Sequence, residues 1–312
     1  MSTTSDIARV TSTISDLRDV DDQHGGGACR RTAQAYLPGA LRLLTTQAHD
    51  AASRRLHRVV AELHSVAGWT AFDTAHLPEA FRHLGVALEL AIYSGDEDLQ
   101  AHVLYRLGRI YLHQEAPAEA LALFQRGLSV IGKAGHPLTV AILSANQAWA
   151  HAKMADADRA LALLGQATDA FARADPGQTA SWSRFFDEVD LQAMIGMVHG
   201  ELARTVHPSH TRSAVPALTG ALADYGSDMA RSRAFCLITL SICHLLDGDS
   251  DEAAVAGEAA IEIGEEVKST RIDDRMRPLQ AQLLRGDAHG LGERIASFVA
   301  VRARCDWTAG GA

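Results

Sequence analysis

The fold is decided by residues 107–128, which read LGRIYLHQEAPAEALALFQRGL. Two small residues, Gly108 and Ala120, stand twelve positions apart, and the large apolar Phe124 and the small Gly127 follow Ala120 by four and seven positions. Offsets of four and seven return to the same face of an α-helix, so these residues share one face. The stretch therefore predicts paired helices with small residues where the backbones touch.

The same frame recurs every forty residues along the chain. Ala80, Ala120 and Ala160 mark it, and the same offsets give, in turn, Leu84 and Ala87, Phe124 and Gly127, and Leu164 and Ala167. A fourth copy runs from Ser241 to Ile261, and another, from Gly196 to Leu222, fits if six extra residues lie in the loop 204–210. One helical hairpin cannot bury its own apolar face, so repeated hairpins stack on one another. We therefore expect an all-α, right-handed solenoid of about five helical hairpins.

Helices outside the repeats complete the expected organisation. Residues 1–73 should hold N-terminal helices that lead into the first repeat, with a stop at Gly25-Gly26-Gly27 and a kink or break at Pro38-Gly39. The repeats should occupy residues 60–268, with breaks near residues 94–96, 134–137, 175–177 and 225–227. Residues 269–306 should form capping helices, and residues 307–312 a tail.

Composition favours a cytoplasmic protein that makes no direct contact with DNA or a membrane. Hydrophobic residues make up 47% of the chain at a mean hydropathy of -0.03. No segment approaches the roughly 18 consecutive apolar residues of a membrane span, and the start lacks the features of a signal peptide. The net charge is -9, and the sequence has no cluster of Lys and Arg that would neutralise phosphates.

The sequence indicates neither a metal site nor a cofactor. The cysteines show no C-x-x-C spacing. Among the fifteen histidines, His199 with His207 and His210, or His57 with His64, could supply metal ligands, but no H-E-x-x-H occurs. A glycine-rich phosphate loop and a G-x-S-x-G elbow are also missing. We interpret the histidines as scattered core and surface residues.

Two resemblances accompany this pattern. Leu107-Gly108-x-x-Tyr111, Ala120, Phe124 and Gly127-Leu128 resemble the tetratricopeptide repeat, written with forty rather than thirty-four residues per unit. From about Val10 to Arg302 the chain also resembles the sensor half of bacterial regulators of the xenobiotic-response-element type, which join a helix-turn-helix DNA-binding domain to such repeats. Three stretches carry that resemblance: DDQHGGG (21–27), AGWTAFD (67–73) and WSRFFDE (182–188). The leading DNA-binding helices of that family are missing here, so the resemblance implies a sensor without direct DNA binding.

The first helix of each hairpin should line the concave surface of the stack. Trp69, Arg109, Trp149 and Met197 each follow a small anchor residue by one position and should face that groove. Two indoles flanking a guanidinium could hold an aromatic, cationic or carboxylate-bearing ligand, unless the indoles merely pack between helices. The ligand-binding candidates on or beside this surface are Trp69, Phe72, Asp73, His102, Tyr105, Arg109, Asn146, Trp149, Asp190 and Met197.

The function predicted from these features is recognition. The leading hypothesis is a regulatory protein that binds a peptide, protein or small-molecule ligand in the concave groove and acts through a partner, a homodimer being allowed. The alternative is an enzyme or cofactor-binding protein of a biosynthetic pathway on the same scaffold, with His102, Tyr105, Asp190 or His199 as acid–base candidates. A third hypothesis is a dimerisation scaffold without a small ligand. The carboxylates of Asp187 and Asp190 share a helix face, which could serve acid–base chemistry. Acidic residues are also common in the first turn of a helix, so the pair could simply mark a helix start.

Overall fold

The structure is a computed structural model that describes residues 3–44, 51–175, 177, 183, 185–283 and 289–302. Over these residues the chain is helical and contains no strand, which confirms the all-α expectation. The helices are α1 (Thr3–His24), α2 (Gly26–Leu44), α3 (Ala51–Asp73), α4 (Leu77–Ser94), α5 (Glu97–His113), α6 (Pro117–Ile131), α7 (Pro137–Lys153), α8 (Ala157–Ala172), α9 (Glu188–Thr205), α10 (Thr211–Asp224), α11 (Ala230–Asp247), α12 (Ser250–Glu266), α13 (Thr270–Leu283) and α14 (His289–Arg302). Short 3-10 helices lie between some of them: η1 (Gly132–Ala134), η3 (Pro208–His210) and η4 (Ser227–Met229).

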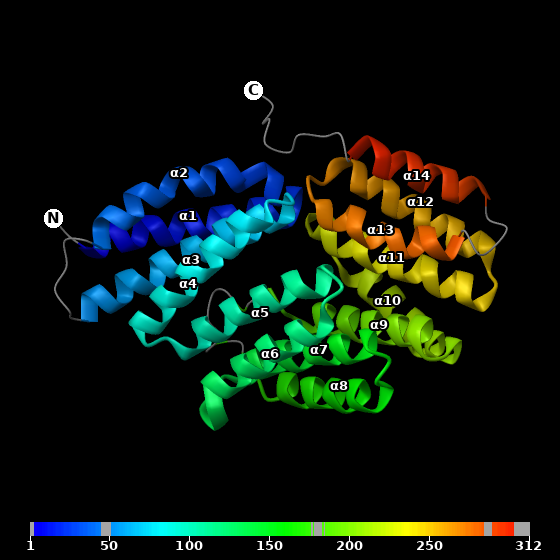
Figure 1. Cartoon of the computed structure of the whole chain (residues 1–312), viewed down its shortest axis with the longest axis horizontal. Coiled ribbons are helices and arrows are strands. Elements are labelled where there is room, and N and C mark those ends of the chain that lie inside the picture. Colours follow the sequence, from blue (N-terminus) through cyan, green and yellow to red (C-terminus); the bar gives the residue numbers. More distant parts are fainter. Residues whose placement is uncertain are drawn as a thin grey trace.

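From α3 onward, consecutive helices pack in pairs: α3 with α4, α5 with α6, α7 with α8, α9 with α10, and α11 with α12 (Figure 1). The turns inside the first three pairs share one backbone geometry. Ala75, Glu115 and Ala155, forty residues apart, have φ angles of 61°, 55° and 59°. The N–H of the following residue donates to a carbonyl five residues back, at 2.8, 3.0 and 2.9 Å in turn. This left-handed closing turn ends a helix with its last carbonyls satisfied.

Small anchor residues lie where the two helices of a pair touch. A Cβ on Gly68 would lie 2.8 Å from Cγ of Leu84, and a Cβ on Gly196 would lie 2.6 Å from Cγ of Leu218. Gly108 has the same relation to Phe124, whose ring fills the space of the missing Cβ. The fourth pair has a longer connection than the others, and η3 forms within it. The repeat frame of this pair therefore resumes at Leu218, after the extra residues that the sequence predicted.

Near the N-terminus, the expected stop at Gly25-Gly26-Gly27 is confirmed, because α1 ends at His24, and of the kink or break expected at Pro38 no break occurs. Only Gly25, with φ of 81°, separates α1 from α2, while Gly26 and Gly27 already belong to α2. Pro38 lies inside α2, which continues to Leu44 without a break. Buried residues on both sides of the proline (Ala33, Leu37 and Ala40) belong to one apolar cluster with α3, and this packing holds the helix together. The expected tail at 307–312 and Pro176 lie outside the described residues.

The stack curls until its two ends meet (Figure 1). Helix α1 packs against α11 and η4. Backbone hydrogen bonds also join the α1–α2 turn to the α12–α13 turn: the N–H of Gly27 donates to the carbonyl of Lys268 at 3.1 Å, and the N–H of Lys268 donates to the carbonyl of His24 at 3.0 Å. The open concave groove expected from the sequence is therefore closed into a ring.

One stretch among the described residues, Ser227–Asp247, matches a membrane-spanning helix in length and in mean hydropathy, 1.3. Half of that stretch is buried inside the ring. Its buried residues, which include Ala234, Cys236, Ile238 and Cys243, belong to the apolar cluster shared with α12, α13 and α14. Core packing accounts for the apolar character of this helix.

Candidate functional site

Asp73, at the C-terminal end of α3, holds the ring closed. Its side chain is completely buried and forms ion pairs with Arg271 of α13 and, at 3.3 Å, with Arg231 of α11. It also accepts hydrogen bonds from the Ser269 hydroxyl (2.6 Å) and the Gly26 N–H (2.7 Å). Burial alone would raise the pKa of this carboxyl, but Arg271 and Arg231 lower it below its usual value. This finding corrects the prediction that Asp73 faces a ligand, because the two arginines enclose it.

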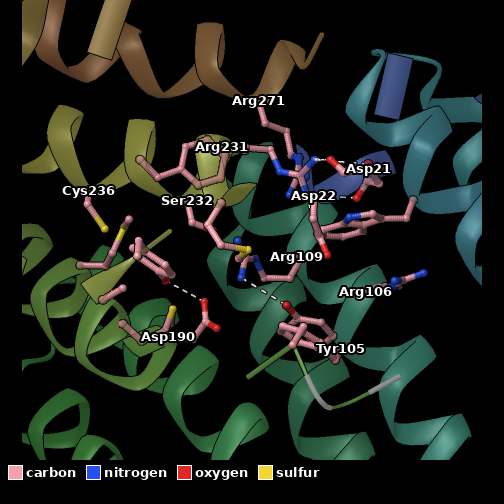
Figure 2. A pocket seen from close by; sticks show the side chains of 18 of the residues that line it. Asp21, Asp22, Tyr105, Arg106, Arg109, Asp190, Arg231, Ser232, Cys236 and Arg271 are labelled. Atoms are coloured by element: carbon pink, nitrogen blue, oxygen red, sulfur yellow. Dashed lines mark hydrogen bonds and ion pairs between the residues drawn. The ribbon is translucent and has the colours of Figure 1, made fainter. Parts of the chain in front are cut away.

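A cavity of about 170 Å³ lies at the centre of the ring (Figure 2). Its walls come from both ends of the chain, including α1, α3, α5, α9, α11 and α13. Guanidinium groups and aromatic rings dominate the wall: Arg18, Arg106, Arg109, Arg231, Arg271 and Arg275, together with Trp69, Tyr105, Phe185, Tyr225 and Phe235. The carboxylates that line it are Asp21, Asp22 and Asp190.

Part of this positive charge is neutralised inside the protein. Arg231 pairs with Asp21 at 3.1 Å and with Asp22 at 3.6 Å, and it also reaches Asp73. Burial, with the neighbouring Asp21, raises the pKa of Asp22 to about 6. Arg18 pairs with Glu62 of α3 at 3.1 Å. Arg231 of α11 therefore connects the two ends of the ring, whereas Arg18 joins α1 to α3 within the N-terminal end.

Three arginines of the cavity have no carboxylate within 4 Å among the described residues: Arg106, Arg109 and Arg275. Arg106 donates to the backbone carbonyl (2.7 Å) and the hydroxyl (3.0 Å) of Ser65, and its guanidinium lies 5.2 Å from the centroid of the Trp69 ring. Burial, helped by the nearby Arg18, lowers the pKa of Arg106 to about 10. Its hydrogen bonds therefore go to neutral groups, while Asp21 and Asp22 act on its charge from beyond ion-pair distance.

Arg109 and Arg275 share one aromatic support. Their guanidinium carbons lie 5.2 and 4.6 Å from the ring centroid of Trp149, and Arg275 is also 4.1 Å from that of Phe235. Arg109 donates long hydrogen bonds, both 3.4 Å, to the hydroxyl of Tyr105 and the Oδ1 of Asn146. The Nε atoms of both arginines are buried without a hydrogen-bond partner. Burial, with Arg109 and Arg271 close by, lowers the pKa of Arg275 to about 9.

Asp190 is a further carboxylate of the cavity wall. It lies in the first turn of α9, where it forms a capping box with Asp187. Its Oδ1 accepts a hydrogen bond of 2.7 Å from the hydroxyl of Tyr225. Burial raises the pKa of Asp190 to about 7. No Lys or Arg among the described residues lies within 4 Å of this carboxylate.

The cavity brings together six of the predicted ligand-binding residues: Trp69, His102, Tyr105, Arg109, Asp190 and Met197. Trp149 lies just outside it and, with Met197 and Arg275, lines a smaller adjacent cavity of about 70 Å³. Phe72 and Asn146 line neither cavity. Phe72 is buried beside Trp69, with ring centroids 5.4 Å apart, and Asn146 is buried where its amide donates to the carbonyl of Ile142 at 2.8 Å. Phe72 also contacts Arg271, and Asn146 accepts from Arg109, so both lie behind arginines that line the cavity.

Sequence reasoning missed most of the arginines. Arg106 precedes Arg109 by three positions on α5, so helical spacing could have indicated it. Arg231, Arg271 and Arg275 come from α11 and α13, and α13 was expected only to cap the stack. They reach the cavity because the ring closes, and forty-residue spacing carries no sign of that closure.

The histidines form pairs rather than larger clusters. His199 lies 3.3 Å from His210 and His64 lies 3.0 Å from His83, measured between Nδ1 atoms. Within the described part of the chain, no three His, Cys, Asp or Glu side chains are grouped as metal ligands would be. Burial, with His83 and Arg82 nearby, lowers the pKa of His64 to about 4, so this pair is neutral near pH 7.

Comparison with known proteins supports the fold and leaves the family open. No protein-family model matches the sequence, and no curated protein matches it. Among solved structures, the chain is similar to the crystal structure of BtubC (BKLC) from P. vanneervenii. That similarity has a TM-score of 0.51 at 19% sequence identity, and it covers 76% of this chain and 89% of that chain. At this identity the likeness concerns the helical architecture alone.

Proposed function

We propose that this protein is a recognition protein, built from five tetratricopeptide-like hairpins, that binds a small anionic ligand with an aromatic or apolar part in its central cavity. One observation carries the proposal: Arg109 and Arg275 lie together on the ring of Trp149, and no carboxylate among the described residues lies within 4 Å of either. Arg106, on the ring of Trp69, lines the same cavity. Planar guanidinium groups bind carboxylate and phosphate through paired hydrogen bonds and stack on aromatic rings. An anion would relieve the repulsion between Arg109 and Arg275.

The volume of the cavity bears on which ligand binds: a peptide, a protein segment or a small molecule. A protein cavity of roughly 150 Å³ is large enough to hold benzene. The central cavity, at about 170 Å³, therefore suits a ring-sized molecule with one or two polar groups. We therefore propose a small molecule as the ligand, because the cavity volume matches a molecule of this size.

A ligand in this cavity would also influence the shape of the whole chain. It would contact α5, α9, α11 and α13, which belong to separate parts of the stack. Within the stack each hairpin packs mainly on its sequence neighbours, so opening of the ring is opposed chiefly by the contacts that join its two ends. Ligand contacts that exist only in the closed ring shift the population towards it. We propose that a partner protein binds the closed ring and the more open shape with different affinities, as a regulatory role requires.

A second candidate function, catalysis, is favoured by one observation. His102, Tyr105 and Asp190 all line the central cavity, whereas His199 lies outside it and pairs with His210. A carboxyl with a pKa of about 7 suits general acid–base work near neutral pH. The catalytic reading predicts slow chemical change of a bound ligand, and mass spectrometry of a ligand recovered after incubation would detect it.

The proposed function predicts that Arg109→Ala weakens binding of hydrocinnamate, a carboxylate joined to a phenyl ring. The loss should be about 1.5–3 kcal/mol, the range for losing a hydrogen bond to a charged group. Stability should hardly fall, because the same change removes a charge that repels Arg275. Isothermal titration calorimetry measures the affinity, and thermal unfolding measures the stability.

Arg126→Ala is the matched control. Arg126 is exposed on α6 and does not line the central cavity, and its loss changes the net charge by the same amount. Hydrocinnamate should bind this variant as it binds the wild type. Equal affinity for the wild type and Arg109→Ala would refute the role of the arginines.

A further inference from the structure

We propose that the ligand of the central cavity is zwitterionic, with an ammonium group that binds Asp190 and an anionic group that binds the arginines. This inference deepens the proposed function and rests on it. The aromatic α-amino acids meet this description, with both charged groups and a ring in one small molecule. Figure 2 shows the carboxylate of Asp190 and the guanidinium of Arg109 in the same cavity, from α9 and α5.

The hydrogen bonds of Asp190 leave room for a cation. Its Oδ1 accepts one hydrogen bond from Tyr225, and its Oδ2 accepts only a long one, 3.5 Å, from the N–H of Asp187. An ionised carboxylate has about four acceptor positions. An ammonium group has three donors and no acceptor, so it matches the positions that remain.

None of the side chains that face Asp190 is positively charged, so none takes the place of a cationic group of the ligand. The groups that face it are Asp187 on its own helix, Tyr225 after α10 and Cys236 on α11. Burial raises the pKa of Cys236 to about 12 and raises that of Tyr225 further, so both are neutral near pH 7. A ligand with only an anionic group would meet repulsion from the ionised Asp190. A ligand that also carries an ammonium group would satisfy both sides of the cavity.

Three probes separate the two poles of the site. L-phenylalanine carries both charges, hydrocinnamate lacks the ammonium group, and phenethylamine lacks the carboxylate. We expect L-phenylalanine to bind the wild-type protein about ten- to a hundredfold more tightly than hydrocinnamate, the usual effect of one hydrogen bond to a charged group. Phenethylamine should bind more weakly than L-phenylalanine, because it leaves the arginines unpaired. Calorimetric titration gives each affinity.

Asp190→Asn tests the acidic pole, since asparagine keeps the shape and can still accept the Tyr225 hydrogen bond. The variant should bind L-phenylalanine and hydrocinnamate with nearly equal affinity, whereas Arg109→Ala should lose affinity for both. In the wild type, the preference for L-phenylalanine should grow from pH 6 to pH 8, as the carboxyl with its pKa of about 7 becomes ionised. Asp22, with a pKa of about 6, titrates in the same cavity, so Asp190→Asn is titrated in parallel. The growth in preference should disappear in this variant.

The outcomes distinguish the two proposals. Tighter binding of L-phenylalanine that depends on Asp190 supports the zwitterionic ligand. Equal binding of hydrocinnamate and L-phenylalanine to the wild type overturns the zwitterionic ligand and leaves the anion site standing. Failure of both acids to bind overturns the anion site as well.

Discussion

At the scale of single residues, the repeat depends on small anchors that large side chains cover. Gly108 on α5 is covered by the ring of Phe124 on α6, and both residues are buried. A methyl group at Gly108 would overlap this ring, and overpacking of a tight core costs energy because neighbours must leave their preferred rotamers. The anchors therefore set how closely two helices approach.

Gly108→Ala should lower the free energy of unfolding by about 1–3 kcal/mol, the usual cost of overpacking a core. Gly85→Ala on α4 is the matched control, because a Cβ there meets nothing within 4 Å. That change should raise the free energy of unfolding by about 0.5–1 kcal/mol, since alanine favours a helix over glycine. Urea denaturation measures both. A Gly108→Ala protein as stable as Gly85→Ala would show that the anchor is misassigned.

The sequence identified some residues of the site but not the charge pattern that defines it. Trp69 and Arg109 follow their anchors by one position, so the repeat frame alone indicated that they face inward. Asp73 seemed to belong with them by helical spacing, but its carboxylate is enclosed by Arg231 and Arg271. Partners more than 150 positions away decide such a role. Spacing within one helix gives no information about them.

At the scale of elements, closure depends on the end of α3 meeting α11 and α13. The buried Asp73 carboxylate accepts from Arg231, Arg271, Ser269 and the backbone of Gly26. Asp73→Ala should lower the free energy of unfolding by about 3–5 kcal/mol, because it leaves the buried Arg271 guanidinium without its carboxylate partner and removes one of the carboxylates that hold Arg231. Asp169→Ala, at an exposed site on α8, should change it by less than about 0.5 kcal/mol. Urea denaturation of the three proteins compares them, and equal stability would contradict the role of Asp73 in closure.

The contribution of Asp73 should also depend on pH. Its pKa is lowered in the folded protein, so the unfolded chain takes up a proton first as the pH falls. The stability difference between the wild type and Asp73→Ala should be complete above about pH 4, the pKa range of a free aspartate, and should shrink below it. Denaturation series at pH 6 and pH 3 test this sign. A difference that grows on acidification would be inconsistent with an ionised Asp73.

The sequence predicted elements better than their arrangement. Anchors such as Gly68, Gly108 and Gly196 gave the pairing of helices, because each contact is local and repeats with the chain. The extra residues before α10 were found because the same contact resumes at Leu218. A kink or break was expected at Pro38, and α2 continues without a break because its tertiary packing on α3 outweighs the lost backbone hydrogen bond.

At the scale of the whole molecule, the main departure from expectation is the closed ring (Figure 1). The pitch of a helical stack is the sum of small rotations between neighbouring hairpins. An error of a few degrees at each step separates an open groove from a ring, and residue spacing does not define angles so finely. Closure turns a shallow surface into a cavity where charges are partly desolvated, which strengthens their interaction with a ligand.

The central claim is that the arginine cavity inside the ring binds a small anion with an aromatic part. The most direct measurement is the crystal structure of the wild-type protein soaked with para-bromohydrocinnamate, with bromine located by its anomalous scattering. We expect the bromine peak within the central cavity, among Trp69, Tyr105 and Phe235, and the carboxylate against Arg109 or Arg275. A bromine peak only on the outer surface, with an empty cavity, would contradict the claim.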